Sequence, residues 1–383
     1  MKDATRLTRL GRPHDDRGLV NPSIERGSTI LAPSAAQLYN FPEGRPHYGR
    51  VGLESQRSLR AALCELQGGA GCALTCSGMM ANTLSILTAV TAGGRVLVSD
   101  SVYGPVRGFV LNTLPRYGVT ATFYDPHIGP EIEGLMTDDV QAILLESPGS
   151  LTMELQDVPM IAEIARRKGV ISIIDDTWSA GLTFKPLQMG VDLAVQALTK
   201  HAGGHSDVMM GAVVARDEVM AARLREMERG LGIVTAPDDS YLILRGLRTL
   251  ELRMQRAAQS SLRIADWLSS RSEIGSILHP AHPSHPDHQL FKRDFTGSCG
   301  LFSVTFREWN NKHSIRFLDS LDLFGLGFSW GGFESLAIHC DPQLKRSTSR
   351  PRHPGALIRF SIGLEDADDL ITDISQALDK MSD

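Results

Sequence analysis

The stretch VISIIDDTW, residues 170–178, decides the fold class. Its first five residues are mostly apolar, which predicts a short strand buried on both faces, as in a parallel sheet covered by helices. Asp175 and Asp176 follow directly and mark the carboxyl end of this strand. Open α/β sheets bind their ligands at that edge, so the stretch predicts both a fold class and the place of a site.

Similar apolar runs lie on both sides of this stretch. We expect strands at residues 95–99, 119–124, 142–145, 170–174 and 191–197. Apolar residues at helical spacing predict helices at 55–67, 78–90 and 158–168. This alternation predicts an α/β fold with a mostly parallel central sheet and helices on both faces.

The chain divides into three parts. Residues 1–50 lack periodicity and are expected to form an extended arm that reaches a partner subunit, and residues 51–246 are expected to form a large domain. Residues 247–383 predict a smaller α+β domain. Its expected parts are a long helix at 247–270, a Pro-rich loop at 281–287, strands at 301–306 and 356–362, and a closing helix from 365.

Composition excludes several classes of protein. Lys and Arg number 39 against 44 Asp and Glu, a net charge of −5 without a basic cluster, so we expect no nucleic-acid partner. No apolar run approaches the roughly 20 residues that span a bilayer, and the first residues lack a signal-peptide core, so we expect no membrane partner. Five Cys, an odd number, predict free thiols and a cytoplasmic location.

Lys200 is the sharpest candidate for chemistry. It follows the expected strand 191–197, and burial there would lower the pKa of its amine and make it a nucleophile able to form a Schiff base. Asp175, 25 residues earlier, ends another strand, where its carboxylate could keep a pyridine nitrogen protonated. Taken singly, Lys200 could be a surface residue and Asp175 a turn or cap residue. The pair is more specific than either residue.

Three further candidates stand beside this pair. The turn 75–79, which contains Ser77, Gly78 and Met79, opens a helix whose free N–H groups suit a phosphate, although an ordinary Ser cap has the same pattern. Tyr103 could stack on a flat cofactor or belong to the core. Arg359, among apolar residues, could bind a carboxylate with two parallel hydrogen bonds or form a structural ion pair.

Neither the histidines nor the cysteines predict a metal site. His279, His282, His285 and His288 recur every third residue in a Pro-rich segment, and a polyproline II helix would space them roughly 9 Å apart, too far to share a metal. Cys64, Cys72 and Cys76 lack the spacing of zinc ligands, and we expect them to be buried free thiols.

Eight ordered segments together resemble the transsulfuration family of Cys/Met metabolism enzymes, which depend on pyridoxal 5'-phosphate, and within it the bacterial cystathionine β-lyases. These segments cover nearly the whole chain: YGR (48–50), ESPGSLTMELQDVP (146–159), IDDTWSAG (174–181), QALTKHAGGHSD (196–207), RGLRTL (245–250), KRDFTGSCGLFS (292–303), SWGGFES (329–335) and LIRFSIGLED (357–366). The resemblance implies the type I, aspartate-aminotransferase-like fold.

The resemblance also implies roles for individual residues. Lys200 is expected to carry the cofactor and shuttle protons, Asp175 to pair with the ring nitrogen and Tyr103 to stack on the ring. The phosphate is expected to contact Ser77, Gly78, Met79 and Thr199, with Tyr48 and Arg50 supplied by a neighbouring subunit. Tyr48 is also expected to tune Lys200. Arg359, Ser329 and Trp330 are expected to bind the substrate, and the implied assembly is a homotetramer made of two dimers.

The chain departs from the family pattern at four positions. Ala197 replaces a common Ser and removes one hydroxyl near the phosphate, and Asp176 replaces a common Asn and adds a carboxylate near the site. His201 follows the lysine where Tyr is usual. Phe328 stands where β-lyases tend to have Tyr and γ-acting relatives tend to have Glu, so it bears on substrate choice.

The activity implied is a carbon–sulfur β-lyase that cleaves L-cystathionine to homocysteine, pyruvate and ammonia, in methionine biosynthesis. The alternatives are a cystathionine γ-lyase, a cystathionine γ-synthase, a methionine γ-lyase or a broad cysteine-S-conjugate β-lyase. Phe328 lacks the carboxylate of the γ-enzymes, and Pro105 stands where methionine γ-lyases have Cys. A more remote alternative is a non-catalytic, cofactor-binding regulatory protein.

Overall fold

The computed structural model describes residues 1–12, 18–41, 46–348 and 355–381. The described residues form a large sheet with strand order β1-β7-β6-β5-β4-β2-β3. Its strands are β1 (Gly71–Thr75), β2 (Arg95–Ser99), β3 (Thr120–Tyr124), β4 (Val140–Glu146), β5 (Ile171–Asp175), β6 (Leu193–Gln196) and β7 (Gly211–Ala215). The pairs from β3 to β6 are parallel, whereas β7 runs antiparallel to both neighbours. The predicted mostly parallel sheet is confirmed.

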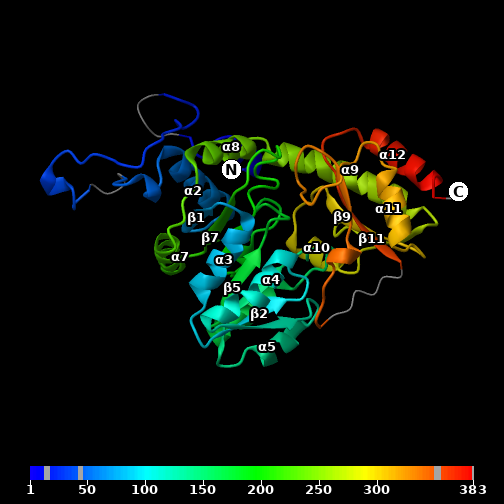
Figure 1. Ribbon diagram of the computed structural model, residues 1–383, viewed down its shortest axis with the longest axis horizontal. Helices are drawn as coiled ribbons and strands as arrows, with labels where there is room; N and C mark the ends of the chain where they lie inside the picture. The colour runs from blue at the N-terminus through cyan, green and yellow to red at the C-terminus, as the bar shows by residue number, and fades with distance from the viewer. Residues whose placement is uncertain (13–17, 42–45, 349–354, 382–383) are drawn as a thin grey trace.

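Helices cover both faces of this sheet (Figure 1). One apolar cluster joins α2 (Glu54–Gln67), α6 (Val158–Lys168) and α8 (Pro237–Leu247) to one face. The other cluster joins α3 (Gly78–Ala89), α4 (Gly104–Asn112) and α7 (Glu218–Gly230) to the opposite face. Successive residues of β5 alternate between the two clusters, Ile173 facing one and Ile174 the other, as the pleat of a doubly covered strand requires.

A smaller antiparallel sheet follows in the chain. Its strands, in spatial order, are β10 (Leu336–His339), β11 (Ala356–Ser361), β9 (Leu301–Phe306) and β8 (Ile274–Leu278). The helices α9 (Leu250–Ser269), α11 (Asn311–Asp319) and α12 (Ala367–Asp379) pack on one face around Phe302, Phe306 and Phe360. Figure 1 shows α9 running from α8 to this sheet. The predicted α+β character of this part is confirmed.

The other short elements connect these layers. They are α1 (Asp3–Leu7), α5 (Ile132–Leu135), α10 (His288–Asp294) and the 3-10 turns Ala35–Gln37, Gly49–Val51, Leu114–Tyr117, Gly129–Glu131, Pro186–Met189 and Asp341–Gln343. None of the helices in the described residues is long and apolar enough to cross a membrane.

The N-terminal fifty residues are only partly an arm. Residues 3–7 form α1, and Leu7 and Leu10 are buried in the core of the large sheet, where Arg248 donates to both of their carbonyls. The prediction of an irregular arm from the first residue was therefore wrong, because two buried leucines anchor its start. Figure 1 shows the following blue segment extending away from the body of the molecule.

A strap between β10 and β11 returns to the large sheet; we define it as residues 344–348. The buried carboxylate of Asp100, just after β2, accepts hydrogen bonds from the backbone N–H groups of Ser347 and Thr348 at 2.8–2.9 Å. Arg107, on α4, donates to the same carboxylate at 2.8 Å. Arg346 donates to the carbonyl of Ser150, in the loop after β4. The strap thus joins the small sheet to two elements of the large one.

Two of the sequence predictions about side chains were wrong. The histidines do not form a polyproline II helix, because the N–H groups of His282, His285 and His288 each donate to the carbonyl three residues earlier, at 2.8–3.1 Å. The thiols are free, but Cys64 and Cys72 are only partly buried and Cys76 is exposed, since it lies in the turn that leaves β1 rather than within the strand.

Candidate active site

Two carboxylates lie side by side at the carboxyl ends of neighbouring strands. Asp175 ends β5 and is in register with Glu146, which ends β4. Asn82, on the first turns of α3, donates to Asp175 Oδ2 at 2.8 Å, and Thr177 donates to Oδ1 through its N–H at 3.0 Å and its hydroxyl at 2.5 Å. These bonds fix the orientation of the Asp175 carboxylate and link it to the start of α3.

Glu146 is a site residue that the sequence reasoning missed. Its Oε2 accepts the N–H of Tyr103 at 2.7 Å, and burial, with the nearby Asp175 charge, raises its pKa well above the ordinary value. Burial and the charges of Glu146 and Asp175 raise the pKa of Tyr103, whereas Arg359 lowers it. All four groups therefore lie within electrostatic reach of one another. Glu146 ends an apolar run as Asp175 does, and that shared pattern could have revealed it.

Lys200 lies in the same region, in the loop after β6. Its Nζ donates to Ser329 Oγ at 2.9 Å and lies 5.4 Å from the centroid of the Trp330 ring. The pKa of Lys200 is lowered to about 8, mainly by burial and also by the Arg359 charge, while the Asp175 charge acts in the opposite direction. Roughly one tenth of the amine is therefore unprotonated at pH 7, far more than for an ordinary lysine, and this fraction can act as a nucleophile or base.

Ser329 also connects Lys200 to the small sheet. Arg359, on β11, is 8% exposed and donates from Nη2 to the carbonyl oxygen of Ser329 at 3.2 Å. Burial lowers the pKa of its guanidinium. The group nevertheless keeps its charge, because the ordinary pKa of arginine is very high. A buried cation with a planar fork of donors suits a carboxylate. Phe328, the preceding residue, is 78% exposed.

The start of α3 forms a second part of the site. Ser77 caps this helix, its hydroxyl accepting the Met80 N–H at 3.1 Å, and the first-turn N–H groups of Gly78 and Met79 have no acceptor within the helix. A Cβ at Gly78 would lie 2.4 Å from the Cβ of Ala197, so only glycine allows this approach to the loop that carries Lys200. The small side chain of Ala197 also permits this close approach between the start of α3 and the loop that carries Lys200.

Thr199 lies beside Lys200 with its hydroxyl already engaged. Its Oγ1 accepts the N–H of Met210 at 3.0 Å and contacts the Met210 carbonyl at 3.2 Å. The side chain therefore fixes the loop after β6 against the entry to β7.

Tyr48 and Arg50 lie on the arm, apart from these residues. Tyr48 is 44% exposed and pairs with Thr29, and Arg50 donates to the carbonyl of Arg229 at 3.4 Å. Among the described residues, no hydrogen bond joins either of them to Lys200 or Asp175. One chain brings together Lys200, Asp175, Tyr103, Arg359, Ser329 and Trp330, but not these two.

Two departures from the family pattern have structural roles. Asp176 is fully buried, and both of its oxygens accept hydrogen bonds within its own turn, from Ser179 Oγ and from Gly181 N–H. Burial raises its pKa to about 8. Asp176 therefore closes a turn: its carboxyl group lies near the site, beside Asp175, but is engaged within its own turn. His201 packs against Trp330.

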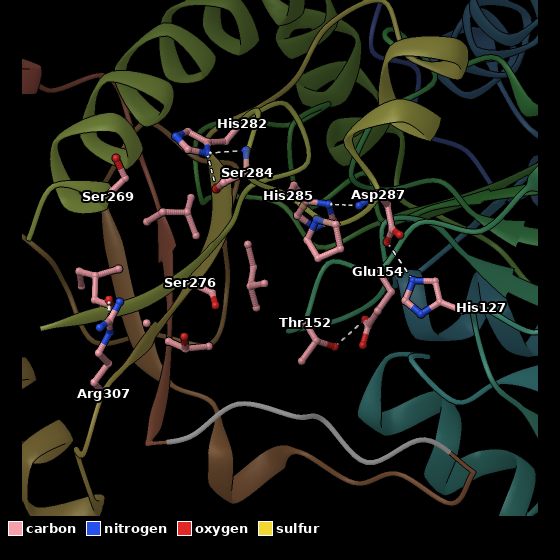
Figure 2. Close-up of a pocket in the computed structure, with 16 residues that line it drawn as sticks. His127, Thr152, Glu154, Ser269, Ser276, His282, Ser284, His285, Asp287 and Arg307 are labelled. Atoms are coloured by element: carbon pink, nitrogen blue, oxygen red, sulfur yellow. Dashed lines mark hydrogen bonds and ion pairs between the residues drawn. The ribbon is translucent and has the colours of Figure 1, made fainter. Parts of the chain in front are cut away.

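A hollow of about 560 Å³ lies elsewhere, along β8 and the histidine loop (Figure 2). Its charged and titratable lining consists of His127, Glu154, His282, His285, Asp287 and Arg307. Figure 2 shows the carboxylates of this hollow engaged with their neighbours, Asp287 with His127 and Glu154 with Thr152. None of the predicted site residues lines it, so cavity size alone would misplace the site.

The residues present fit pyridoxal phosphate. A fixed carboxylate suits a protonated ring nitrogen, a Gly-opened helix start suits a phosphate, and a buried amine with a lowered pKa suits an aldehyde. Asn82 connects the first two groups, and the approach of Gly78 to Ala197 connects the helix start to the lysine loop. The fold and this site together define a pyridoxal-phosphate-dependent enzyme.

Comparison with known proteins gives the family. The sequence model of the Cys/Met metabolism PLP-dependent enzymes matches residues 4–379, and the chain belongs to this family. It is 40% identical to cystathionine beta-lyase MetC of Escherichia coli (strain K12) over 97% of this chain and 96% of that protein. It is 36% identical to the L-alanine/L-glutamate racemase of Wolbachia pipientis wMel over 100% of this chain and 98% of that protein.

The fold has a close match among solved structures. The crystal structure of metB from Corynebacterium glutamicum superimposes with a TM-score of 0.92 at 28% sequence identity, covering 100% of this chain and 98% of that one. The predicted type I fold is therefore confirmed.

Proposed function

We propose that this protein is a pyridoxal-phosphate-dependent carbon–sulfur β-lyase that cleaves L-cystathionine to homocysteine, pyruvate and ammonia. The observation that carries the proposal is the junction at Ser329, where the Lys200 amine and the Arg359 guanidinium meet on one residue. It gives an amino-acid substrate a carboxylate-binding group beside a base. The 40% identity to a cystathionine beta-lyase supports the choice of reaction.

The chain's own residues would divide the work as follows. Arg359, with Ser329 and Trp330, binds the α-carboxylate of the substrate and thereby orients its Cα–H bond. Lys200 removes the Cα proton and later returns a proton to the departing sulfur, which its pKa of about 8 permits. When bound, the cofactor supplies the electron sink for this chemistry. Asp175 holds a negative charge where the ring nitrogen is expected.

The remaining residues hold the cofactor in this proposal. Tyr103 stacks on its ring, since Glu146 fixes the Tyr103 backbone beside Asp175. The phosphate lies at the start of α3, on Ser77, Gly78 and Met79, near Thr199. Phe328 contributes apolar surface at the distal end of the substrate.

The arm supplies the rest of the site from a second subunit. Tyr48 and Arg50 lie apart from Lys200 in their own chain, which supports a role across a subunit boundary. We propose a homo-oligomer, a tetramer built as a dimer of dimers, in which Tyr48 tunes Lys200 and Arg50 binds the phosphate. We further propose a large domain at 51–246, a small domain at 247–383 and a cytoplasmic location, which free thiols suit.

Other reactions share the first step, removal of the Cα proton. They are γ-elimination by a cystathionine or methionine γ-lyase, γ-synthase chemistry, β-elimination from other cysteine S-conjugates, and racemisation, the activity in the name of one relative. Phe328 cannot supply the carboxylate expected of γ-enzymes. Its exposed phenyl ring provides no polar group at that position.

Product analysis of the purified holoenzyme tests the proposal. With L-cystathionine we expect pyruvate and homocysteine in equal amounts. Release of 2-oxobutyrate and cysteine would instead establish γ-cleavage. With L-alanine, chiral analysis should show D-alanine forming far more slowly than pyruvate forms from cystathionine; the reverse would make the protein a racemase. No product from any substrate would establish a regulatory protein.

A further inference from the structure

His201, the residue after Lys200, lies under the loop that holds Ser329. It is 4% exposed, and its ring meets the Trp330 indole edge to face, with centroids 5.3 Å apart and planes at 68°. Trp330 in turn lies 5.4 Å from the Lys200 amine. Lys200 and His201 therefore contact the same short loop, one through its reactive group and the other through its ring.

The backbone of this loop rests directly on the His201 ring. Gly331 has a positive φ of 79°, and a Cβ there would lie 2.9 Å from His201 Nδ1 and 3.1 Å from the His201 backbone nitrogen. The Gly331 N–H donates to Ser361 Oγ at 3.2 Å, which attaches the loop to the end of β11. The strand β11 also carries Arg359. The size of the His201 ring therefore sets how closely the loop with Ser329 and the strand β11 can approach Lys200.

The base of this contact is rigid. Arg253, on α9, donates from Nη1 to the carbonyl of His201 at 2.8 Å and from Nη2 to the carbonyl of Gly246 at 2.7 Å. A Cβ at Gly204 would overlap the same guanidinium, so Arg253 fills the space beneath the lysine loop. His201 consequently cannot retreat from Trp330 without displacing the half-buried Arg253, which is held by two backbone carbonyls.

The ring acts through its shape rather than by proton transfer. Burial and the charges of Arg253 and Lys200 lower the pKa of His201 to about 3, while carbonyl contacts near Gly331 and Trp178 act the other way. The ring is therefore neutral at any working pH. Its Nε2 has no hydrogen-bond partner among the described residues.

We propose that His201 is a positioning residue that holds the Trp330 indole and the adjoining Ser329 against Lys200 and Arg359. Its ring prevents the loop from collapsing onto the lysine segment, and so keeps Ser329 between the two charged side chains. The inference rests on the proposed function in one respect, that Arg359 binds the substrate carboxylate.

Replacement of the ring tests this role. His201→Ala should raise KM for cystathionine at least tenfold and change kcat less than threefold, because loss of one charge-assisted contact to a carboxylate is worth about a factor of ten or more in affinity. His201→Phe keeps a flat ring and should keep KM within about twofold of the wild-type value. Equal KM values in all three proteins would overturn the proposal.

A control separates positioning from loss of stability. His279 is also fully buried, its pKa is likewise about 3, and it packs against Phe302 in the small sheet. His279→Ala should lower the melting temperature as much as His201→Ala does but leave KM unchanged. A matching rise of KM in His279→Ala would show that any buried cavity has this effect, and would overturn the specific role of His201.

A double-mutant cycle and a measurement without turnover complete the test. Against Trp330→Phe, the effect of His201→Ala on KM should shrink to less than about threefold, since coupled residues are not additive. In the resting holoenzyme, acrylamide quenching of the Trp330 fluorescence, taken as the difference from Trp330→Phe, should increase in His201→Ala and not in His279→Ala. Additive KM effects or unchanged quenching would overturn the proposal. If the wild type fails to cleave cystathionine, the proposed function fails, while quenching still tests the contact.

Discussion

Lys200 and Arg359 meet on a single serine. The amine of Lys200 donates to the Ser329 hydroxyl at 2.9 Å, and the guanidinium of Arg359 donates to the Ser329 carbonyl at 3.2 Å. Lys200 lies in the loop after β6 of the large sheet, and Arg359 lies on β11 of the small one. The proposed base and the proposed carboxylate-binding group are therefore aligned by Ser329, which lies outside both sheets.

Lys200→Ala should abolish turnover and the visible absorbance of the lysine-bound cofactor. The reason is that Lys200 is the residue of the proposed site whose amine has a pKa lowered to about 8. Absorbance spectra before and after borohydride reduction, with a pyruvate assay, check this result. Lys200→Arg serves as a charge-keeping control and should be equally inactive. A reducible Schiff base in Lys200→Ala would assign the cofactor to another lysine.

Arg359→Lys should weaken substrate binding and spare cofactor binding. A point ammonium cannot reproduce two parallel hydrogen bonds to a carboxylate, so kcat/KM should fall at least about tenfold. Titration of the apo-enzyme with pyridoxal phosphate should give a Kd within about twofold of the wild-type value. An equal loss in both measurements would place Arg359 at the phosphate instead.

Asp176→Asn should stabilise the protein at high pH and not at low pH. Burial raises the native pKa of Asp176 to about 8, so between the unfolded value near 4 and this value the native state binds more protons than the unfolded state. Its contribution to stability is full below pH 4 and is lost as the pH rises towards 8. An amide cannot ionise and can still bond to Ser179 and Gly181, so it avoids this loss.

The measurement is the melting temperature of both proteins at pH 5 and pH 8.5. Relative to wild type, Asp176→Asn should gain up to about 4 kcal/mol in the free energy of unfolding between these two pH values, the amount that a pKa raised from near 4 to about 8 implies. Ser179→Ala, which removes one bond to the carboxylate, should not show that gain. A pH-independent difference would mean that Asp176 is ionised in the native state.

Arg50→Ala and Lys200→Ala subunits should complement each other when mixed. If Arg50 acts in a neighbouring subunit's site, hybrid dimers contain one site with both residues intact, so activity should approach about one quarter of wild type in a random one-to-one mixture. Each variant alone should be nearly inactive. Native mass spectrometry confirms that the subunits exchange. An exchanged mixture without recovered activity would place Arg50 in its own chain's site.

Phe328→Tyr should increase the preference for cystathionine over an apolar S-alkylcysteine. Phe328 is exposed, so a hydroxyl added there can reach solvent-side polar groups of a long substrate at a gain of about 0.5–1.5 kcal/mol, or several-fold in kcat/KM. The ratio of kcat/KM for the two substrates is the quantity to compare. An unchanged ratio would show that position 328 does not contact the distal group, and would remove the main argument against γ-elimination.

The sequence predicted most of the strands but missed β1 and β7 in the large sheet and β8 and β10 in the small one. β1 reads GCALT and β7 reads GAVVA, and their small residues resemble turn sequence until they pair with each other in the sheet. The histidine loop was misread for a related reason. Each His-Pro pair places proline at the second position of a turn, a pattern that favours i-to-i+3 closure as much as an extended helix.

The site was predictable where a motif is local and unpredictable where it depends on register or on distant loops. Asp175 ends an apolar strand, Arg359 lies on one and Lys200 closely follows one, so single segments revealed them. Glu146 also ends an apolar run, which made it a possible candidate, but only the pairing of β4 with β5 places its carboxylate opposite Asp175. The sequence could not predict that the Ser329 hydroxyl oxygen lies 2.9 Å from the Lys200 amine nitrogen, because 129 residues separate the two in the chain.

The strap at residues 344–348 makes the two halves of the molecule a single cooperative unit. Asp100 lies fully buried at the end of β2, and the strap supplies backbone N–H donors to its carboxylate. Removal of the strap would leave Asp100 paired with Arg107 but without these N–H donors, and a buried acceptor that loses its donor costs about 1–3 kcal/mol. Neither half is then an independent module that could be exchanged between relatives or expressed separately. A recombination point placed between Asp100 and the strap, at the start of the small sheet for example, would draw the two sides of this hydrogen-bonded anchor from different parents.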